Sequence, residues 1–300
     1  MSKFKLWIHS FRLRTLPLAL STTLTGSITA YSANKFQWTV FVLASLTALF
    51  LQILSNLAND YGDAVSGVDK IRKGPLRVVQ SGLITKKEMT YMILVFILLS
   101  LTTGILLIYI SFPSLLNIKS IIFFILGLGA IAAAINYTIG NNPYGYKGWG
   151  DLFVLLFFGI IGSGGTYYLH TKNITITSLL PAFFIGFFSV GVLNINNLRD
   201  EESDRESNKK SLVVIFGKRF GIIYHDILII VGYLALILYN IFSSDGHMKW
   251  FFLILSPLII IHLRNVNLSK SNESMNNELK RLAITTFLTT ILWGLGIIVF

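Results

Sequence analysis

Long apolar segments dominate the hydrophobic pattern of this chain, and short polar stretches separate them. The apolar segments are about 20 residues long, the length that a helix needs to cross the hydrocarbon core of a bilayer. They lack the strict alternation that marks the strands of a membrane barrel. The pattern predicts nine transmembrane helices, at residues 16–33, 38–58, 89–111, 119–139, 151–170, 175–197, 219–242, 249–265 and 282–300. The weakest of these is 249–265, because it is short and contains Pro257 and His262.

The composition agrees with a membrane protein of the helical class. Of the 300 residues, 53% are hydrophobic and only 13% are charged, whereas about 25% are charged in a typical soluble domain. The chain contains no Cys, which excludes disulfides, thiolate metal sites and a Cys nucleophile. We therefore expect an all-α integral membrane protein whose nine helices form a single bundle and a single domain, residues 1–300.

The positive charges sort the connecting loops into two sides. With nine spans, 21 of the 25 Lys and Arg residues fall on the side that holds the N-terminus. Such an excess of Lys and Arg marks the cytoplasmic side. We expect a multi-pass protein of the inner (cytoplasmic) membrane, with its N-terminus and its long, polar loops in the cytoplasm and its C-terminus outside. The net charge of +11 then reflects topology, and it does not indicate a nucleic-acid partner.

Acidic residues are concentrated at the cytoplasmic ends of two predicted helices. Eight of the 14 Asp and Glu residues lie within 60–69 and 200–206, and Asn residues precede both groups inside the apolar segments. The spacing of Asn56, Asp60 and Asp63 puts them on one face if the helix continues, and the spacing of Asn196, Asp200 and Asp204 does the same. Like charges at this spacing repel one another, and more strongly near lipid. Oxygen ligands of this kind suit Mg²⁺, which carboxylates commonly bind together with the phosphates of a substrate.

Basic residues are interleaved with both acidic groups. Arg72 and Arg77 follow the first group, and Arg199 and Lys209 flank the second. Metal ions on one side and cationic side chains on the other are what a diphosphate site requires. The competing interpretation is that both groups are solvated helix ends at a positively charged membrane interface.

The two acidic motifs resemble those of the UbiA superfamily of intramembrane aromatic prenyltransferases. They read Asn59-Asp60-Tyr-Gly-Asp63 and Asp200-Glu-Glu-Ser-Asp204, after the second and sixth predicted helices. The third acid of the first motif is Asp69, whereas the family's usual position is occupied here by Gly67. This variant is similar to the menaquinone-pathway branch of the superfamily. Three further stretches support that branch, at residues 12–17, 144–159 and 196–209.

The resemblance implies a magnesium-dependent enzyme that joins two substrates at the membrane. It would transfer a polyprenyl group from polyprenyl diphosphate to 1,4-dihydroxy-2-naphthoate, with loss of carbon dioxide and diphosphate, and give demethylmenaquinol. It also implies a central cavity capped by cytoplasmic loops. We expect a lipid bilayer around the protein, no nucleic acid and no obligate protein partner.

The resemblance also assigns roles to individual residues. The expected catalytic Mg²⁺ ligands are Asn59, Asp60 and Asp63 for one ion and Asp200 and Asp204 for the other. The expected substrate-binding residues are Asn56, Asp69, Arg72, Arg77, Lys147, Asn196, Asn197, Arg199 and Lys209, of which Arg72, Arg77, Arg199 and Lys209 would clamp the diphosphate. Lys147 would bind a carboxylate or a phosphate, and its competing interpretation is a side chain reaching up to the membrane interface.

Two other functions remain open at this point. A protein of the same fold could use another aromatic acceptor, such as 4-hydroxybenzoate, homogentisate or haem. A divalent-cation transporter could also carry acids in its helices, but it would place them near the middle of the bilayer rather than at cytoplasmic helix ends. The five His residues are scattered without ligand spacing, and we expect none of them to be functional.

Overall fold

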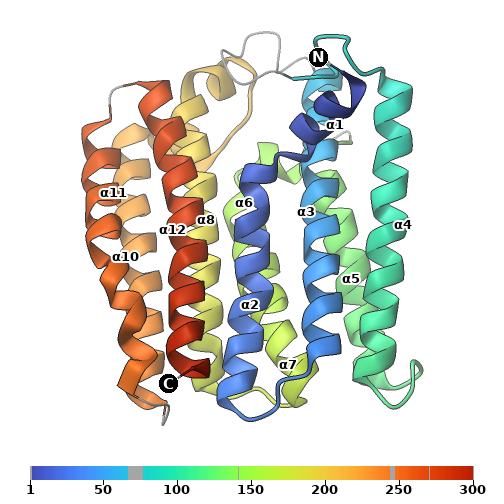
Figure 1. Cartoon of the computed structure of the whole chain (residues 1–300). Coiled ribbons are helices and arrows are strands. Elements are labelled where there is room, and N and C mark those ends of the chain that lie inside the picture. Colours follow the sequence, from blue (N-terminus) through green and yellow to red (C-terminus); the bar gives the residue numbers. More distant parts are fainter. Residues whose placement is uncertain (1, 67–76, 141, 244–246, 270, 300) are drawn as a thin grey trace.

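The helices of this chain stand side by side and form a bundle, with the two termini at its opposite ends (Figure 1). The structure is a computed structural model, and it describes residues 2–66, 77–140, 142–243, 247–269 and 271–299. Within these ranges every regular element is a helix, so the prediction of an all-α fold is confirmed. The elements in chain order are α1 (Lys3–Phe11), η1 (Leu13–Thr15), α2 (Leu16–Ser32), α3 (Trp38–Ser66), α4 (Lys86–Ser111), α5 (Ile118–Asn136), η3 (Tyr144–Tyr146), α6 (Gly150–Val154), η4 (Leu155–Gly164), α7 (Gly165–Thr171), α8 (Ile176–Glu206), α9 (Leu212–Phe216), α10 (Lys218–Phe242), η5 (His247–Leu255), α11 (Ser256–Leu268) and α12 (Asn272–Ile298).

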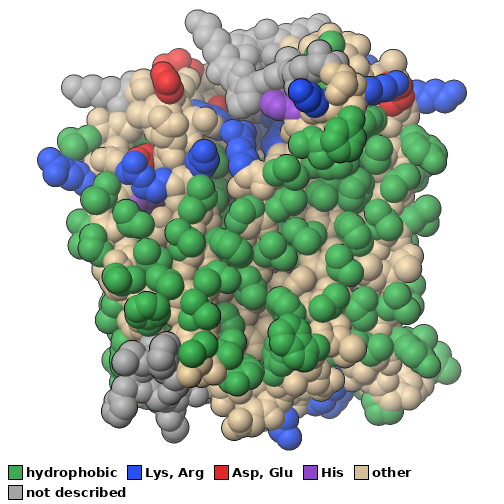
Figure 2. All heavy atoms as spheres, viewed as in Figure 1, with side chains coloured by type: hydrophobic (Ala, Val, Ile, Leu, Met, Phe, Trp, Pro, Cys, Tyr) green, Lys and Arg blue, Asp and Glu red, His purple; other side chains and the backbone are tan. Residues whose placement is uncertain are grey.

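The predicted membrane spans correspond to these helices. Eight helices of the described residues are long and apolar enough to cross a membrane. The first predicted span corresponds to α2, which is not among these eight because it has 17 residues and is slightly too short. Termini at opposite ends of the bundle are what an odd number of spans requires (Figure 1). Hydrophobic side chains cover the middle of the surface, and charged side chains gather at its two ends (Figure 2).

Three spans differ in detail from the sequence prediction. The helices α3 and α8 continue to Ser66 and Glu206, beyond the predicted ends at 58 and 197. The hydrophobic pattern marks only the apolar part of each helix, and the helical hydrogen bonds continue through the polar residues that follow. The weak span at 249–265 begins as the 3₁₀-helix η5 and becomes α-helical at α11. Pro257 lies in the first turn of α11, where its missing N–H leaves no helical hydrogen bond unmade.

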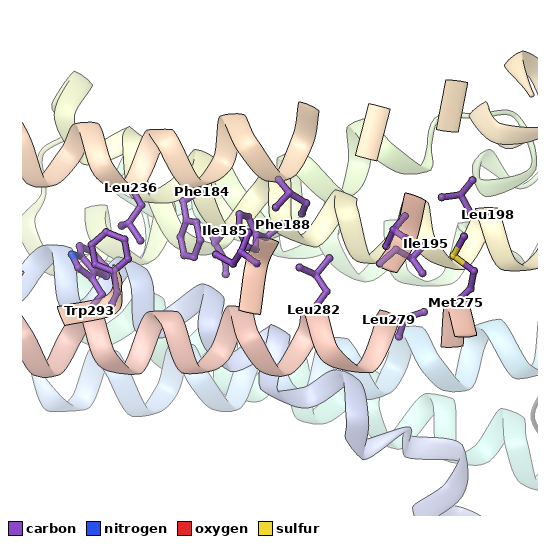
Figure 3. Close-up of a cluster of buried hydrophobic side chains, with 14 of the residues drawn as sticks. Phe184, Ile185, Phe188, Ile195, Leu198, Leu236, Met275, Leu279, Leu282 and Trp293 are labelled. Carbon is purple, nitrogen blue, oxygen red and sulfur yellow. The ribbon is translucent and has the colours of Figure 1, made fainter. Parts of the chain in front are cut away.

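Large side chains between α8, α10 and α12 form the main packed core (Figure 3). Phe184 and Phe188 of α8, Leu236 of α10 and Trp293 of α12 are almost completely buried there. The Trp293 indole Nε1–H donates to Asn240 Oδ1 at 3.1 Å, so its polar atom has a partner, as a buried indole requires. A second cluster joins α3 and α4 near α1, around Leu54, Leu57 and Met89.

Close approach of backbones fixes the helices that surround the central cavity. A Cβ at Gly26 of α2 would lie 2.3 Å from the carbonyl oxygen of Ser163 in η4, and one at Gly159 of η4 would lie 2.8 Å from that of Ala182 in α8. Such small residues let helices approach where lipid gives no hydrophobic driving force for association. The segment η4 is π-helical over Leu155–Gly164, so the fifth span has a wider turn where it faces α2 and α8.

A buried polar chain ties α10, α11 and α12 together on the other side of the bundle. His225 Nε2 lies 3.0 Å from His262 Nε2, and His262 Nδ1 lies 2.8 Å from Glu278 Oε2. All three side chains are almost inaccessible to solvent. Residues distant in sequence therefore meet in space, which the scattered His positions did not indicate.

Candidate active site

A cavity of about 400 Å³ opens among the helices of the bundle. Its walls come from α2, α3, α4, α5, η4 and α8, and most of the side chains that line it are apolar. Asn56 and Asn59 of α3 and Asn196 of α8 line it as well, and both helices carry an acidic motif just beyond these Asn residues. The apolar cavity therefore reaches the parts of α3 and α8 that lead into the two predicted motifs.

The first motif lies on the last turns of α3. Asp63 accepts hydrogen bonds from Arg77 Nη2 at 3.0 Å and from the Tyr146 hydroxyl at 2.9 Å. Asn59 Oδ1 accepts one from Thr138 Oγ1 at 3.2 Å. The turn between these residues needs Gly62, because a Cβ there would lie 2.6 Å from Thr138 Oγ1. The turn that follows α5 thus packs directly against the motif and holds the Asn59 side chain.

Asp60 differs from the other motif acids in its surroundings. Its side chain is 3% exposed, and its Oδ1 has no hydrogen-bond partner among the described residues. Arg12 lies close enough for its charge to act on this carboxylate. A buried carboxylate oxygen without a partner is costly, and a cation bound to it would remove that cost.

The second motif lies on the last turns of α8, where each acid pairs with a cation. Arg199 grips Asp200 with two hydrogen bonds, from Nε to Oδ1 at 2.8 Å and from Nη2 to Oδ2 at 2.7 Å. The same guanidinium donates to Asn196 Oδ1 at 2.7 Å and to Asn276 Oδ1 of α12 at 3.1 Å. Asp204 accepts from Lys209 Nζ at 2.9 Å. These buried charges are held by one another and by neighbouring amides.

The arrangement of the acids suits metal binding together with a phosphate substrate. Among the described residues, no group of three or more His, Asp and Glu is placed to hold a metal ion alone. Each motif instead offers two carboxylates one helical turn apart, with an amide beside them in the first. This oxygen donor set, with the partnerless Asp60 oxygen, fits Mg²⁺, which carboxylates commonly bind while waters and phosphate oxygens complete the shell.

The loop around η3 connects the two motifs. Besides its bond to Asp63, the Tyr146 hydroxyl lies 3.2 Å from Ser66 Oγ, and the Tyr146 carbonyl accepts from the Lys210 N–H at 2.9 Å. Burial raises the pKa of the Tyr146 phenol, and the negative charge of Asp63 raises it further. The hydroxyl therefore stays protonated and donates to Asp63 at any physiological pH.

The comparison with known proteins identifies the family. Residues 19–281 match the UbiA prenyltransferase family. This chain belongs to the UbiA prenyltransferase family. An Escherichia coli protein named 1,4-dihydroxy-2-naphthoate octaprenyltransferase is 41% identical over 298 residues, which cover 99% of this chain and 96% of the relative. The family resemblance found in the sequence motifs is confirmed.

Solved structures of UbiA homologues share the fold. One from Aeropyrum pernix has a TM-score of 0.67 at 15% identity and covers 94% of this chain and 97% of its own. One from Archaeoglobus fulgidus, described as bound to GPP and Mg²⁺, has a TM-score of 0.61 at 20% identity and covers 97% of this chain and 100% of its own. The all-helical membrane fold predicted from the sequence is thus shared with these UbiA homologues.

The structure of this UbiA protein brings most of the predicted site residues together. Asn56, however, points its amide at the Phe11 carbonyl, at 2.9 Å, and at Thr15 Oγ1, at 3.0 Å, so it holds the segment that joins α1 and α2 even though it lines the cavity. Asn197 is buried, and its Oδ1 has no partner among the described residues. Asp69 and Arg72 lie outside the described residues.

The Lys of the loop around η3 does not lie with the other predicted site residues. Lys147 is exposed and is not among the described residues that line the cavity. Asp151, four residues later, is buried next to Tyr224 of α10. Among the described residues of this loop, Tyr146 makes a side-chain hydrogen bond to an acidic motif.

Sequence reasoning missed four residues that contribute to the UbiA site. Tyr146 and Thr138 contact the first motif through side-chain hydrogen bonds, and Arg12 and Arg14 line the cavity. The stretches 12–17 and 144–159 both supported the family resemblance, so they contained a signal for three of them. Thr138 has no such signal in the sequence, since its contact depends on how α5 packs against α3.

We expect Tyr146→Phe to lower kcat/KM about tenfold while leaving the protein folded. The substitution removes one hydrogen bond to a charged group, which contributes about 1.5 kcal/mol, and keeps the ring. Steady-state prenyl transfer by purified protein measures the loss. Tyr91→Phe is the matched control, because Tyr91 is 69% exposed on α4. Equal rates for Tyr146→Phe and the control would contradict a role for this hydroxyl.

Proposed function

We propose that this chain transfers a polyprenyl group from polyprenyl diphosphate to 1,4-dihydroxy-2-naphthoate and so forms demethylmenaquinol. The observation that carries the proposal is the pairing of two acidic motifs, Asp60/Asp63 and Asp200/Asp204, next to one apolar cavity. The name of the E. coli relative, which is aligned over nearly the whole chain, supports this acceptor over 4-hydroxybenzoate, homogentisate or haem. Membership of a prenyltransferase family argues against a divalent-cation transporter.

We propose that Asn59, Asp60 and Asp63 hold one Mg²⁺ and that Asp200 and Asp204 hold the other. The partnerless oxygen of Asp60 and the Mg²⁺ bound by the Archaeoglobus fulgidus homologue support this assignment. When bound, the metal ions supply electrostatic stabilisation of the negative charge that develops on the departing diphosphate.

The chain's own cations have a matching role in this reaction. Arg77, Arg199 and Lys209 each pair with a motif acid. When a diphosphate binds, the same side chains would donate to its oxygens, and the carboxylates that they release would be available to hold Mg²⁺. Positioned donors of this kind stabilise the charge released as the allylic C–O bond breaks. We place Arg72, which lies outside the described residues, in this same set.

The cavity provides the setting for the second half of the reaction. The carboxyl-bearing carbon of the naphthoate ring attacks the allylic carbon, a C–C bond forms, and the carboxylate leaves as carbon dioxide with its electron pair returned to the ring. Apolar walls exclude water, which would otherwise capture the allylic cation. The same walls give a long isoprenoid tail an environment like that of lipid.

Topology completes the proposal. We propose that the protein lies in the inner membrane as one domain, with its N-terminus and both acidic motifs on the cytoplasmic side. The unequal division of Lys and Arg between the two sides supports this orientation. The charged diphosphate and carboxylate groups of the two substrates then meet the motifs at the cytoplasmic face of the membrane.

We expect purified protein with Mg²⁺, a polyprenyl diphosphate and 1,4-dihydroxy-2-naphthoate to form a prenylated naphthoquinol that lacks the carboxyl group. Mass spectrometry of the extracted lipids identifies the product. Chelation with EDTA should abolish turnover, and added Mg²⁺ should restore it. A product formed from 4-hydroxybenzoate but not from the naphthoate would overturn the proposed acceptor.

A further inference from the structure

Two arginines supply the positive charge of the apolar cavity. Among the described residues that line it, Arg12 and Arg14 are the ones with charged side chains, and no Asp or Glu is among them. Both are half-buried in the segment that joins α1 and α2. Figure 2 shows Lys and Arg side chains in a recess at this end of the bundle. Positive charge between low-dielectric walls attracts an anionic ligand.

The proposed reaction brings two anionic groups to the site, the diphosphate and the acceptor's carboxylate. The cations that pair with motif acids, Arg77, Arg199 and Lys209, are not among the described residues that line the cavity. Arg12 lies within electrostatic reach of Asp60, which places it beside the first motif. Arg14 lies two residues further along, where the chain enters α2 and the apolar wall.

Hydrogen bonds fix the backbone of the segment between α1 and α2, which carries Arg14. Arg12 has a left-handed backbone conformation, with φ of 49°, and its carbonyl accepts from Thr15 Oγ1 at 2.9 Å. Asn56 of α3 holds the same segment through Thr15 Oγ1 and the Phe11 carbonyl. Because Asn56 lies one turn before Asp60, the base of the Arg14 side chain is held at a set position relative to the first motif.

We propose that Arg14 binds the carboxylate of the aromatic acceptor and thereby selects and orients it in the cavity. The planar guanidinium presents parallel N–H groups that match the two oxygens of a carboxylate. A carboxylate gripped in this way fixes the ring carbon that bears it, which is the carbon to be alkylated. Holding that carbon towards the allylic carbon is a positioning effect of the kind that lowers a bimolecular barrier. This inference rests on the proposed function.

The test uses two stable ligands that differ only in the carboxylate, 1-hydroxy-2-naphthoate and 1-naphthol. Their affinities for the full chain in detergent are measured by titration calorimetry. We expect Arg14→Gln to weaken binding of the naphthoate about 10- to 100-fold, the effect of losing a hydrogen-bonded charge pair, and to leave naphthol binding unchanged. Arg14→Lys keeps the charge but loses the parallel N–H groups, so its affinity for the naphthoate should lie between those of the wild type and Arg14→Gln. Lys5→Gln, which removes a charge from the exposed face of α1, should change neither.

Three outcomes would overturn the assignment of Arg14. These are equal weakening of both ligands, unchanged binding of both, and a raised KM for the prenyl diphosphate with an unchanged KM for the acceptor. If Arg14→Gln fails to fold, Arg14→Lys replaces it in the test. A weaker preference for the naphthoate over naphthol than in the wild type would then support the assignment, and an unchanged preference would overturn it. Wild-type protein that prenylates no naphthoate would instead overturn the proposed function, whereas a naphthoate prenyltransferase whose Arg14→Gln variant still prefers the carboxylated ligand would overturn this inference alone.

Discussion

Asp60→Asn is expected to reduce prenyl transfer by about three orders of magnitude or more without unfolding the protein. Asp60 presents a buried oxygen that has no hydrogen-bond partner among the described residues, so the protein fold does not depend on that oxygen. Catalysis does depend on that oxygen if it holds a metal ion, because metal ions stabilise the diphosphate leaving group by several kcal/mol. Each 1.36 kcal/mol of that stabilisation is a factor of ten in rate. Asn preserves the size of the side chain and removes its charge.

Two measurements separate loss of metal binding from loss of structure. The first is turnover as a function of Mg²⁺ concentration. The second is the thermal midpoint with and without Mg²⁺ and pyrophosphate, since a ligand that binds the folded state raises it. The wild type should respond to the ligands, and Asp60→Asn should not. Glu202→Gln is the control, because Glu202 belongs to the second acidic group but is exposed. Wild-type turnover and metal response in Asp60→Asn would refute the metal assignment.

The parts of the fold that depend on local sequence could be predicted. A span of about 20 apolar residues has one stable arrangement in lipid, a helix, so the elements followed directly from the hydrophobic pattern. Spacing along a helix also placed Asp60 and Asp63, and Asp200 and Asp204, one turn apart. Because α3 and α8 continue without a break through these residues, the periodicity applied to the motifs themselves.

The partners of the site residues could not be predicted in the same way. Tyr146 meets Asp63 across 83 positions of sequence, and Asn56 meets Phe11 across 45. Such contacts depend on which helices pack together and on how far each one extends. For the same reason the sequence did not indicate that the Asn56 amide also holds the entry to α2, or that Arg14 lines the cavity.

The structure also shows that residues in equivalent positions of the two motifs differ in how their charges are paired. Asp60 and Asp200 are equivalent in their motifs, yet Arg199 grips Asp200 with two short bonds, whereas one oxygen of Asp60 has no hydrogen-bond partner among the described residues. The two substitutions should therefore have similar effects on activity and different effects on stability.

Asp200→Asn is expected to abolish turnover and also to destabilise the protein by about 3–5 kcal/mol, the cost of breaking a buried ion pair from one side. The Arg199 side chain is 6% exposed, and its guanidinium would keep its charge without the carboxylate that faces it. Its bonds to Asn196 and Asn276 involve neutral amides, which do not replace a counter-charge. Thermal unfolding in detergent, measured without metal, reports this cost as a lowered midpoint.

A neighbouring ion pair on the same helix provides the matched control. Glu201 pairs with Arg205 one turn later, but the Arg205 side chain is 60% exposed, and exposed pairs contribute about 0–1 kcal/mol. Glu201→Gln should therefore leave both the midpoint and the turnover near wild type. Combining Asp200→Asn with Arg199→Gln removes the stranded charge, so stability should recover while activity does not. If stability stays low in the double variant, packing rather than charge accounts for the effect; if activity returns, the Asp200 carboxylate is not a metal ligand.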